Sequence, residues 1–300
     1  MSGHDHAHGS QHLGGVHRWR LLVALGLVVG FMLVEFVAAA LSGSLALLTD
    51  AGHMLADSIT LTTATVATIV ASRSRRTAHA TYGAYRAEVF ASGFAALVMI
   101  AVAIFVVISA LSGHATHEVE TTPMLVVGII GLTVNIVTML ILRPGSESLN
   151  VKGAYLEVLA DALGSVGVIA AAILVKVTGA AWWDIAIALA IGAFVLVRAV
   201  ILGREVLHVL AQHTPHGIDT GSLEARLCGL EGVAQIHDLH VWALTSGMNV
   251  MSVHVLISDD ADPQATLQAA QALVGSEFGL DHATIQVESR ASDSCEHITW

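Results

Sequence analysis

The sequence predicts an all-α membrane domain of six transmembrane helices followed by a small α+β domain. Three observations support this fold class. Six apolar runs are each long enough for a helix to cross a bilayer, which takes roughly 20 residues. The mean hydropathy is +0.72, and only 12% of the residues are charged, against about 25% in soluble domains. Near Ala211 the apolar runs give way to mixed polar and apolar residues, enough for one further domain.

Residues 1–17 precede the first apolar run and are rich in histidine, glycine and serine. Their low hydrophobicity predicts a disordered tail. Because His-rich tracts can bind metal weakly, the tail either collects metal or is only a soluble extension. Its histidines are His4, His6, His8, His12 and His17.

The basic residues around the six apolar runs predict how the chain crosses the membrane. Arginine or lysine precedes the first run, follows the second, separates the fourth from the fifth and follows the sixth, whereas the alternate gaps contain neither. The positive-inside rule then places both termini in the cytoplasm, with the protein in the inner or plasma membrane of the cell. The expected spans cover 21–41, 45–71, 85–111, 124–142, 154–177 and 182–202.

The second run carries polar side chains in the middle of an apolar stretch. In a helix, His53 and Asp57 lie four residues apart and therefore on one face. An ionised aspartate near the bilayer centre costs about 2.5–3.5 kcal/mol, so such a group is expected to have a function and a partner. Imidazole and carboxylate together suit a divalent metal ion.

The fifth run repeats this arrangement. Glu157 and Asp161 have the same spacing, and residues 159–161 repeat the Leu-Ala-Asp of residues 55–57. Two facing helices then offer four nitrogen and oxygen donors, which suit a tetrahedral ion such as zinc. The alternative is that the two motifs are unrelated and serve helix packing or a proton relay.

Four further polar residues occupy the runs. Asp50 lies three residues before His53, on much the same face, and is expected beside the metal site rather than as a ligand. Glu35, Glu88 and Asn135 either line a hydrophilic path or form hydrogen bonds between helices.

The segment after the sixth run is predicted to contain three strands and two helices in the order helix, strand, strand, helix, strand. The helices are expected at 222–228 and 263–278, and the strands at 233–243, 249–257 and 282–288. Neighbouring strands can bring His237, His254 and Glu288 together at one edge as a second metal site. Alternatively, these are only polar residues on an exposed sheet face.

In four stretches the chain resembles the cation diffusion facilitators, specifically the zinc-transporter branch of bacterial zinc, cadmium and cobalt exporters. The resemblance covers essentially the whole chain after the tail. It rests on Ser-Leu-Ala-Leu-Leu-Thr-Asp-Ala-Gly-His-Met-Leu-Ala-Asp at 44–57, Tyr-Gly-Ala-Tyr-Arg-Ala-Glu at 82–88, Asn-Val-Lys-Gly-Ala at 150–154 leading to Asp161, and His-Asp-Leu-His-Val-Trp at 237–242.

This resemblance implies a homodimer, formed through the cytoplasmic domain and the membrane helices, that exports divalent metal from the cytoplasm in exchange for protons. Zinc is the expected substrate and also the expected regulatory ion, with other divalent cations as alternatives. The transport domain would cover 18–208, and a metallochaperone-like αββαβ domain would cover 209–300. The transport site would consist of His53, Asp57, Glu157 and Asp161, and the cytoplasmic site of His237, His254 and Glu288.

One position departs from the family pattern, because zinc-selective members usually have histidine where this chain has Glu157. Three carboxylates around a divalent ion leave an extra buried negative charge, which is unfavourable. Either Glu157 carries a proton in some states, or the site accepts harder cations such as cobalt, iron or manganese.

Other function classes fit the sequence less well. The net charge is −11 and basic residues form no stripe, which excludes a nucleic-acid footprint. A membrane metallohydrolase needs a general base beside a zinc-bound water, and the spans carry no HExxH motif. A metal sensor that does not transport has little use for a matched pair of intramembrane motifs. We therefore expect a transporter and no enzyme.

Overall fold

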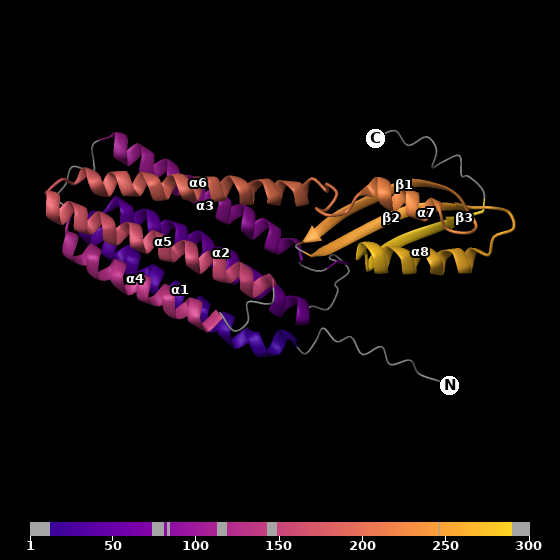
Figure 1. Ribbon diagram of the computed structural model, residues 1–300, viewed down its shortest axis with the longest axis horizontal. Coiled ribbons are helices and arrows are strands. Elements are labelled where there is room, and N and C mark those ends of the chain that lie inside the picture. Colours follow the sequence, from indigo (N-terminus) through magenta and orange to yellow (C-terminus); the bar gives the residue numbers. More distant parts are fainter. Residues whose placement is uncertain are drawn as a thin grey trace. The chain divides into compact units, whose positions relative to one another are not determined.

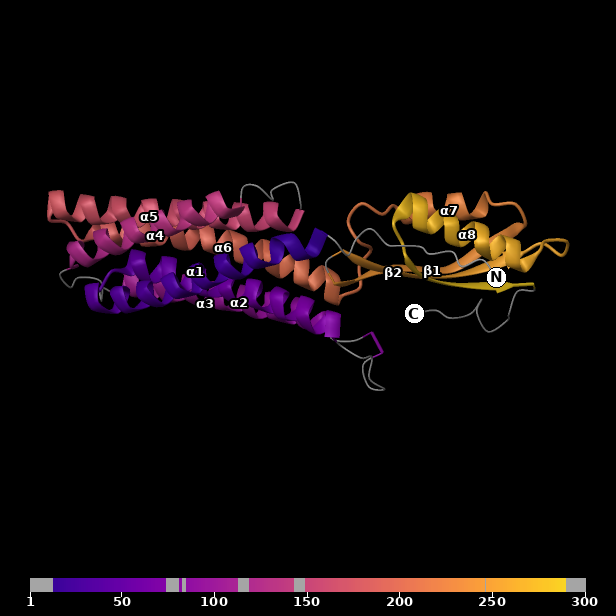
Figure 2. The same cartoon turned by 90° about the horizontal axis from the view of Figure 1, so that it is seen from below.

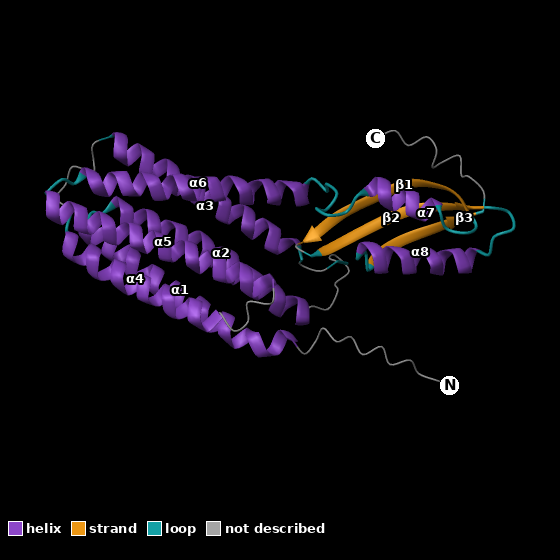
Figure 3. Ribbon diagram, viewed as in Figure 1, coloured by secondary structure: helices purple, strands orange, loops and turns teal. Residues whose placement is uncertain are grey.

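The computed structural model describes residues 13–73, 81–82, 85–112, 119–142, 149–245 and 247–289. The chain divides into two compact units, one formed by Met1–Ser72 and Ala91–Gly203, the other by Arg73–Phe90 and Arg204–Trp300. The first contains most of six long helices, and the second contains a small sheet with two helices (Figures 1 and 3). This confirms the predicted fold class. Residues 1–12 of the predicted tail lie outside the described residues.

The long helices are α1 (Leu13–Ser42), α2 (Leu45–Arg73), α3 (Arg86–Leu111), α4 (Thr121–Leu142), α5 (Leu149–Thr178) and α6 (Trp182–Leu210). Within the described residues, five of them are long and apolar enough to cross a membrane, where the sequence predicted six spans. The sixth, α2, carries Asp50, His53 and Asp57 together with several threonines. Most of its side chains after Ile59 lie outside the described residues, so the role of α2 as the sixth span stays a prediction.

Side-chain polarity in the first unit is reversed relative to that of a soluble protein. Large apolar side chains on α3 point outward, with Phe94 58% and Leu97 65% exposed. Acidic side chains such as Glu35 and Asp161 are buried. A soluble monomer rarely exposes so much contiguous apolar surface, whereas a helix bundle in lipid does so on every outer face.

The start of α2 is held by residues outside that helix. Gly43, with φ +67°, ends the connection from α1, and the Ser44 hydroxyl accepts a hydrogen bond from the Leu47 amide at 3.1 Å. The buried Asp184 carboxylate near the start of α6 accepts hydrogen bonds from Ser44 Oγ at 2.6 Å and from the Leu45 amide at 2.7 Å. The first turns of α2 and α6 are therefore joined.

The second unit contains α7 (Thr220–Cys228), β1 (Val233–Thr245), β2 (Met248–Ile257), α8 (Pro263–Phe278) and β3 (His282–Glu288). In the described sheet β2 is central, antiparallel to β1 and parallel to β3. Both helices lie on one face of the sheet (Figure 2). Hydrogen bonds from Arg226 on α7 to Glu277 on α8 lower the pKa of the Glu277 carboxyl.

Strand β2 shows why the other face of the sheet carries the polar residues. Met251, Val253 and Val255 alternate along the strand and are buried under the helices. Alternation places the intervening His254 on the opposite face. The Asp262 carboxylate caps α8 by accepting a hydrogen bond from the Gln264 amide at 2.9 Å, and Pro263 occupies the first turn. The strands and helices match the predicted order.

Candidate functional site

Three side chains from α2 and α5 converge inside the first unit. His53 and Asp57 lie one turn apart on α2, and Asp161 faces them from α5. His53 Nε2 is 3.5 Å from Asp57 Oδ2 and 3.6 Å from Asp161 Oδ1. Ligand atoms at about 2.0–2.2 Å from a tetrahedral zinc ion lie roughly 3.3–3.6 Å from one another. The three atoms are therefore spaced for one shared ion.

Burial adds to this argument. His53 and Asp161 are each 2% exposed, and Asp57 is partly buried, with 16% of its side chain exposed. Two carboxylates this close together repel each other unless a cation lies between them or a proton is bound. A divalent ion supplies that charge, and the nitrogen and oxygen donors fit zinc or a somewhat harder metal.

The fourth predicted ligand is Glu157, one turn before Asp161 on α5. Its side chain lies outside the described residues. Its role as a ligand stays a prediction.

Sequence reasoning did not identify Arg198, a residue of α6 that reaches the same cluster. Its Nη1 atom is 3.0 Å from His53 Nε2 and 3.7 Å from Asp57 Oδ2. The signal was present, because Arg198 is a basic residue inside the predicted span 182–202. An ionisable residue at such a position is expected to face the bundle interior and to have a function.

Asp50 is a buried residue of α2 and lies beside Gly164 of α5, where the two helices contact each other. A Cβ atom at position 164 would collide with the Asp50 carboxylate. Only glycine leaves room for this acid, because every other residue type carries a Cβ. The structure therefore packs Asp50 against α5, the helix that carries Asp161. The contact is at Gly164, three residues after Asp161 in the sequence.

We expect Gly164→Ala to destabilise the protein by about 1–3 kcal/mol, the usual range for an overpacked core, and to lower transport severalfold by displacing Asp50. Thermal unfolding in detergent and metal uptake into vesicles measure the two effects. Gly167→Ala is the matched control on the same helix, because its added Cβ would meet Ile187 at 3.5 Å, an ordinary contact. Equal effects of the two variants would contradict the prediction.

The remaining intramembrane candidates have different surroundings. Asn135 on α4 donates a hydrogen bond to Ser165 Oγ on α5 at 3.3 Å. This contact favours a role in holding the two helices together over a role in lining a hydrophilic path. Glu35 is fully buried on α1. Glu88, near the start of α3, accepts a hydrogen bond from Thr245 Oγ1 at 2.9 Å within the second unit. A role of these three in a hydrophilic path stays a prediction.

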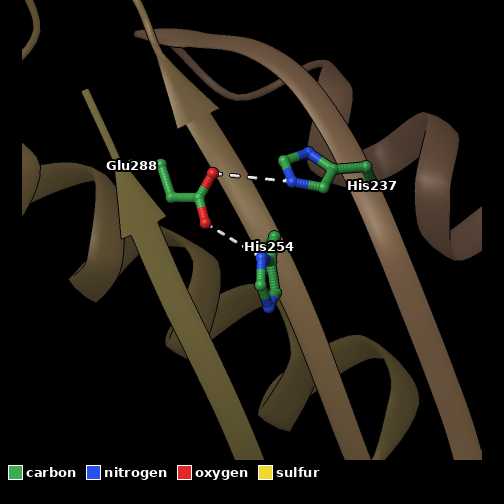
Figure 4. A group of neighbouring side chains, drawn as sticks. All are labelled: His237, His254 and Glu288. Carbon is green, nitrogen blue, oxygen red and sulfur yellow. Dashed lines mark ion pairs between the residues drawn. The ribbon is translucent and has the colours of Figure 1, made fainter. Parts of the chain in front are cut away.

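A second cluster lies on the sheet face opposite the helices (Figure 4). His237 on β1 and His254 on β2 are direct cross-strand partners. Glu288 at the end of β3 contacts both, with Oε1 2.9 Å from His254 Nδ1 and Oε2 3.5 Å from His237 Nε2. Glu288 is 8% exposed, and the two histidines are half-buried. The structure thus brings together the three residues that the sequence placed at one edge.

A bulge in β1 shapes this cluster. The register with β2 shifts between His237 and His240, and Asp238 in between has φ +53°. Aspartate is one of the few residues with a side chain that tolerates this backbone region. Asp238 Oδ1 lies 2.8 Å from His240 Nε2, and Oδ2 lies 3.8 Å from His254 Nε2. His254 therefore stands between the carboxylates of Glu288 and Asp238.

Comparison with known proteins covers both units. Residues 21–211 match the family described as "Cation efflux transmembrane domain", and residues 215–290 match "Cation efflux protein, cytoplasmic domain". The "Metal cation efflux system protein CzcD" of Cupriavidus metallidurans is 41% identical over 99% of this chain and 94% of its own length. The "Cadmium, cobalt and zinc/H(+)-K(+) antiporter" of Bacillus velezensis is 36% identical over 96% and 93%. The "Zinc transporter ZitB" of Escherichia coli is 37% identical over 95% and 92%.

Proposed function

Because the chain belongs to the cation efflux family, in its zinc, cadmium and cobalt branch, we propose that it exports divalent metal, above all zinc, from the cytoplasm by proton antiport. This is a family of integral membrane transporters and not of enzymes. The observation that carries the proposal is the buried convergence of His53, Asp57 and Asp161 from two helices. Glu157 completes the proposed site.

Proton coupling follows from the chemistry of the ligands. A metal ion binds the neutral imidazole of His53 and the ionised carboxylates of Asp57 and Asp161, so protons and metal compete for the same atoms. Loading from the cytoplasm releases protons, and protonation from the other side expels the metal. The Bacillus velezensis relative is named a cadmium, cobalt and zinc/H(+)-K(+) antiporter, and this name supports both the proton coupling and a broader metal range.

Inverted membrane vesicles test the proposal directly. With an acidic interior, zinc should accumulate in vesicles that contain the protein and not in vesicles that lack it. Collapse of the pH gradient with nigericin should abolish accumulation. Competition with cadmium, cobalt, iron and manganese ranks the substrates. Uptake that survives collapse of the gradient would refute antiport, and no uptake of any of these metals would refute export.

The cytoplasmic cluster is proposed to hold a further, regulatory ion, and the second unit to pair with that of another copy. The supporting observation is the position of His237, His254 and Glu288, whose candidate ligand atoms all lie within 4.8 Å of one another. A site shared between strands of one small domain responds to cytoplasmic metal without being part of the membrane bundle.

We expect the double variant His237→Ala/His254→Ala to bind about one zinc ion fewer per chain and to lose activation of transport by cytoplasmic zinc, because only one of the three donors remains. Metal content of the purified full chain and uptake rate against zinc concentration measure these effects. His282→Ala, on β3 but outside the cluster, is the control. Unchanged zinc content would contradict the prediction.

A further inference from the structure

The side chain of Arg198 crosses from α6 to the cluster on α2 and α5. Asp184 joins the starts of α6 and α2, and Arg198 lies about 21 Å further along α6, while His53 lies only about 14 Å along α2 from Ser44. The guanidinium therefore reaches the cluster by pointing back toward the start of α6, the direction in which helical side chains lean. It arrives 3.0 Å from His53 Nε2.

The chemistry of that contact assigns the roles of both partners. A guanidinium has only N–H donors and stays protonated in proteins, so at this contact His53 Nε2 must be the acceptor. The same nitrogen faces Asp57 Oδ2 at 3.5 Å and Asp161 Oδ1 at 3.6 Å, and it is therefore the atom that would coordinate an ion between them. One nitrogen lone pair cannot serve a guanidinium and a metal ion at once.

Among the ligands that the structure describes, which leave Glu157 out, charge leads to the same conclusion. Asp57 and Asp161 bring two negative charges when ionised, and Arg198 offsets one of them at 3.7 Å from Asp57. A divalent ion offsets both. If the guanidinium stayed in place beside the ion, two like charges would lie within a few ångströms of each other in a largely buried site, which is unfavourable.

We propose that Arg198 is a tethered cation of the transport site, whose guanidinium occupies the place of the metal in the empty carrier and must be displaced when metal binds. The proposal rests on the proposed function and adds to it a residue that sets metal affinity. The arginine stem is long and has several rotamers, so withdrawal along α6 requires no movement of the backbone. In the empty carrier, Arg198 shields the aspartates, which weakens metal binding and assists release.

Direct zinc binding to the purified full chain tests this role independently of transport. The His237→Ala/His254→Ala background removes the cytoplasmic cluster, and the tail histidines are the same in every variant. A difference between variants in competition with a chelator dye therefore reports the membrane site. We expect Arg198→Gln, which keeps length and polarity but removes the charge, to bind zinc at least 10-fold more tightly. Arg198→Lys, which keeps the charge, should stay within about threefold of the parent. Arg204→Gln, an exposed arginine further along α6, is the charge-matched control.

Unchanged or weaker zinc binding by a monodisperse Arg198→Gln would overturn the proposal, because Arg198 would then only support the structure of the site. If that variant does not fold, Arg198→Met removes the same charge and is subject to the same criterion. Vesicle transport separates the two ideas. If the wild type takes up zinc but Arg198→Gln and Arg198→Met bind zinc with unchanged affinity, only the proposal of a tethered cation is contradicted. If the wild type takes up no zinc, the proposal that the protein is an exporter is contradicted.

Discussion

Asp161→Asn is expected to lower zinc uptake into inverted vesicles on the order of 100-fold or more. Loss of a residue that only supports a metal ligand typically costs about 10- to 100-fold, and loss of a ligand should cost more. Asparagine has nearly the same shape, so packing at this buried position stays unchanged while one anionic ligand is removed. The remaining amide oxygen is a weaker ligand for a divalent ion. His53 also loses the negative charge that faces its Nε2 atom at 3.6 Å.

The same chemical change at an exposed position provides the control. Asp260→Asn, in the turn after β2, removes one carboxylate from the surface of the second unit and should leave uptake unchanged. Protein amount in the vesicles and elution on gel filtration verify that both variants fold. Uptake at the wild-type rate by Asp161→Asn would show that this residue does not bind the transported ion, and it would leave the α2–α5 convergence without a function.

Each half of the membrane site was predictable because its residues lie one helical turn apart in the sequence. A helical spacing of four places His53 beside Asp57 whatever the rest of the chain does. The matching motif at Asp161 then indicated a partner helix, since a buried acid needs a counter-charge. Arg198 has no such local relation to His53. Its contact depends on how α6 packs on α2, which a single sequence does not encode as spacing.

The second unit shows the same division between local and long-range information. The strands were predictable from alternation and from the glycine turn at Gly247, which fixes a hairpin. The register across strands was open, because it depends on the bulge at Asp238 and on the parallel pairing of β2 with β3. It is this register that places Glu288 beside both His237 and His254.

Glu157→His is expected to change the metal ranking, with cobalt and manganese uptake falling at least 10-fold relative to zinc. Imidazole is a softer ligand than carboxylate and favours zinc over harder cations. The change also removes one negative charge from a site that already contains Asp57 and Asp161. If Glu157 binds a proton during the wild-type cycle, the variant should exchange fewer protons per metal ion. Competition uptake and a pH-sensitive dye inside the vesicles measure the two effects.

The two outcomes separate the two explanations for an acid at this position. A narrower metal range with the same proton count means that Glu157 is a ligand that broadens selectivity. A lower proton count with the same ranking means that it is a proton carrier, because a third carboxylate beside a divalent ion is stable only when its charge is neutralised. If neither quantity changes, the side chain at 157 does not contact the ion. The transport site would then contain the three side chains from α2 and α5 that converge in the structure.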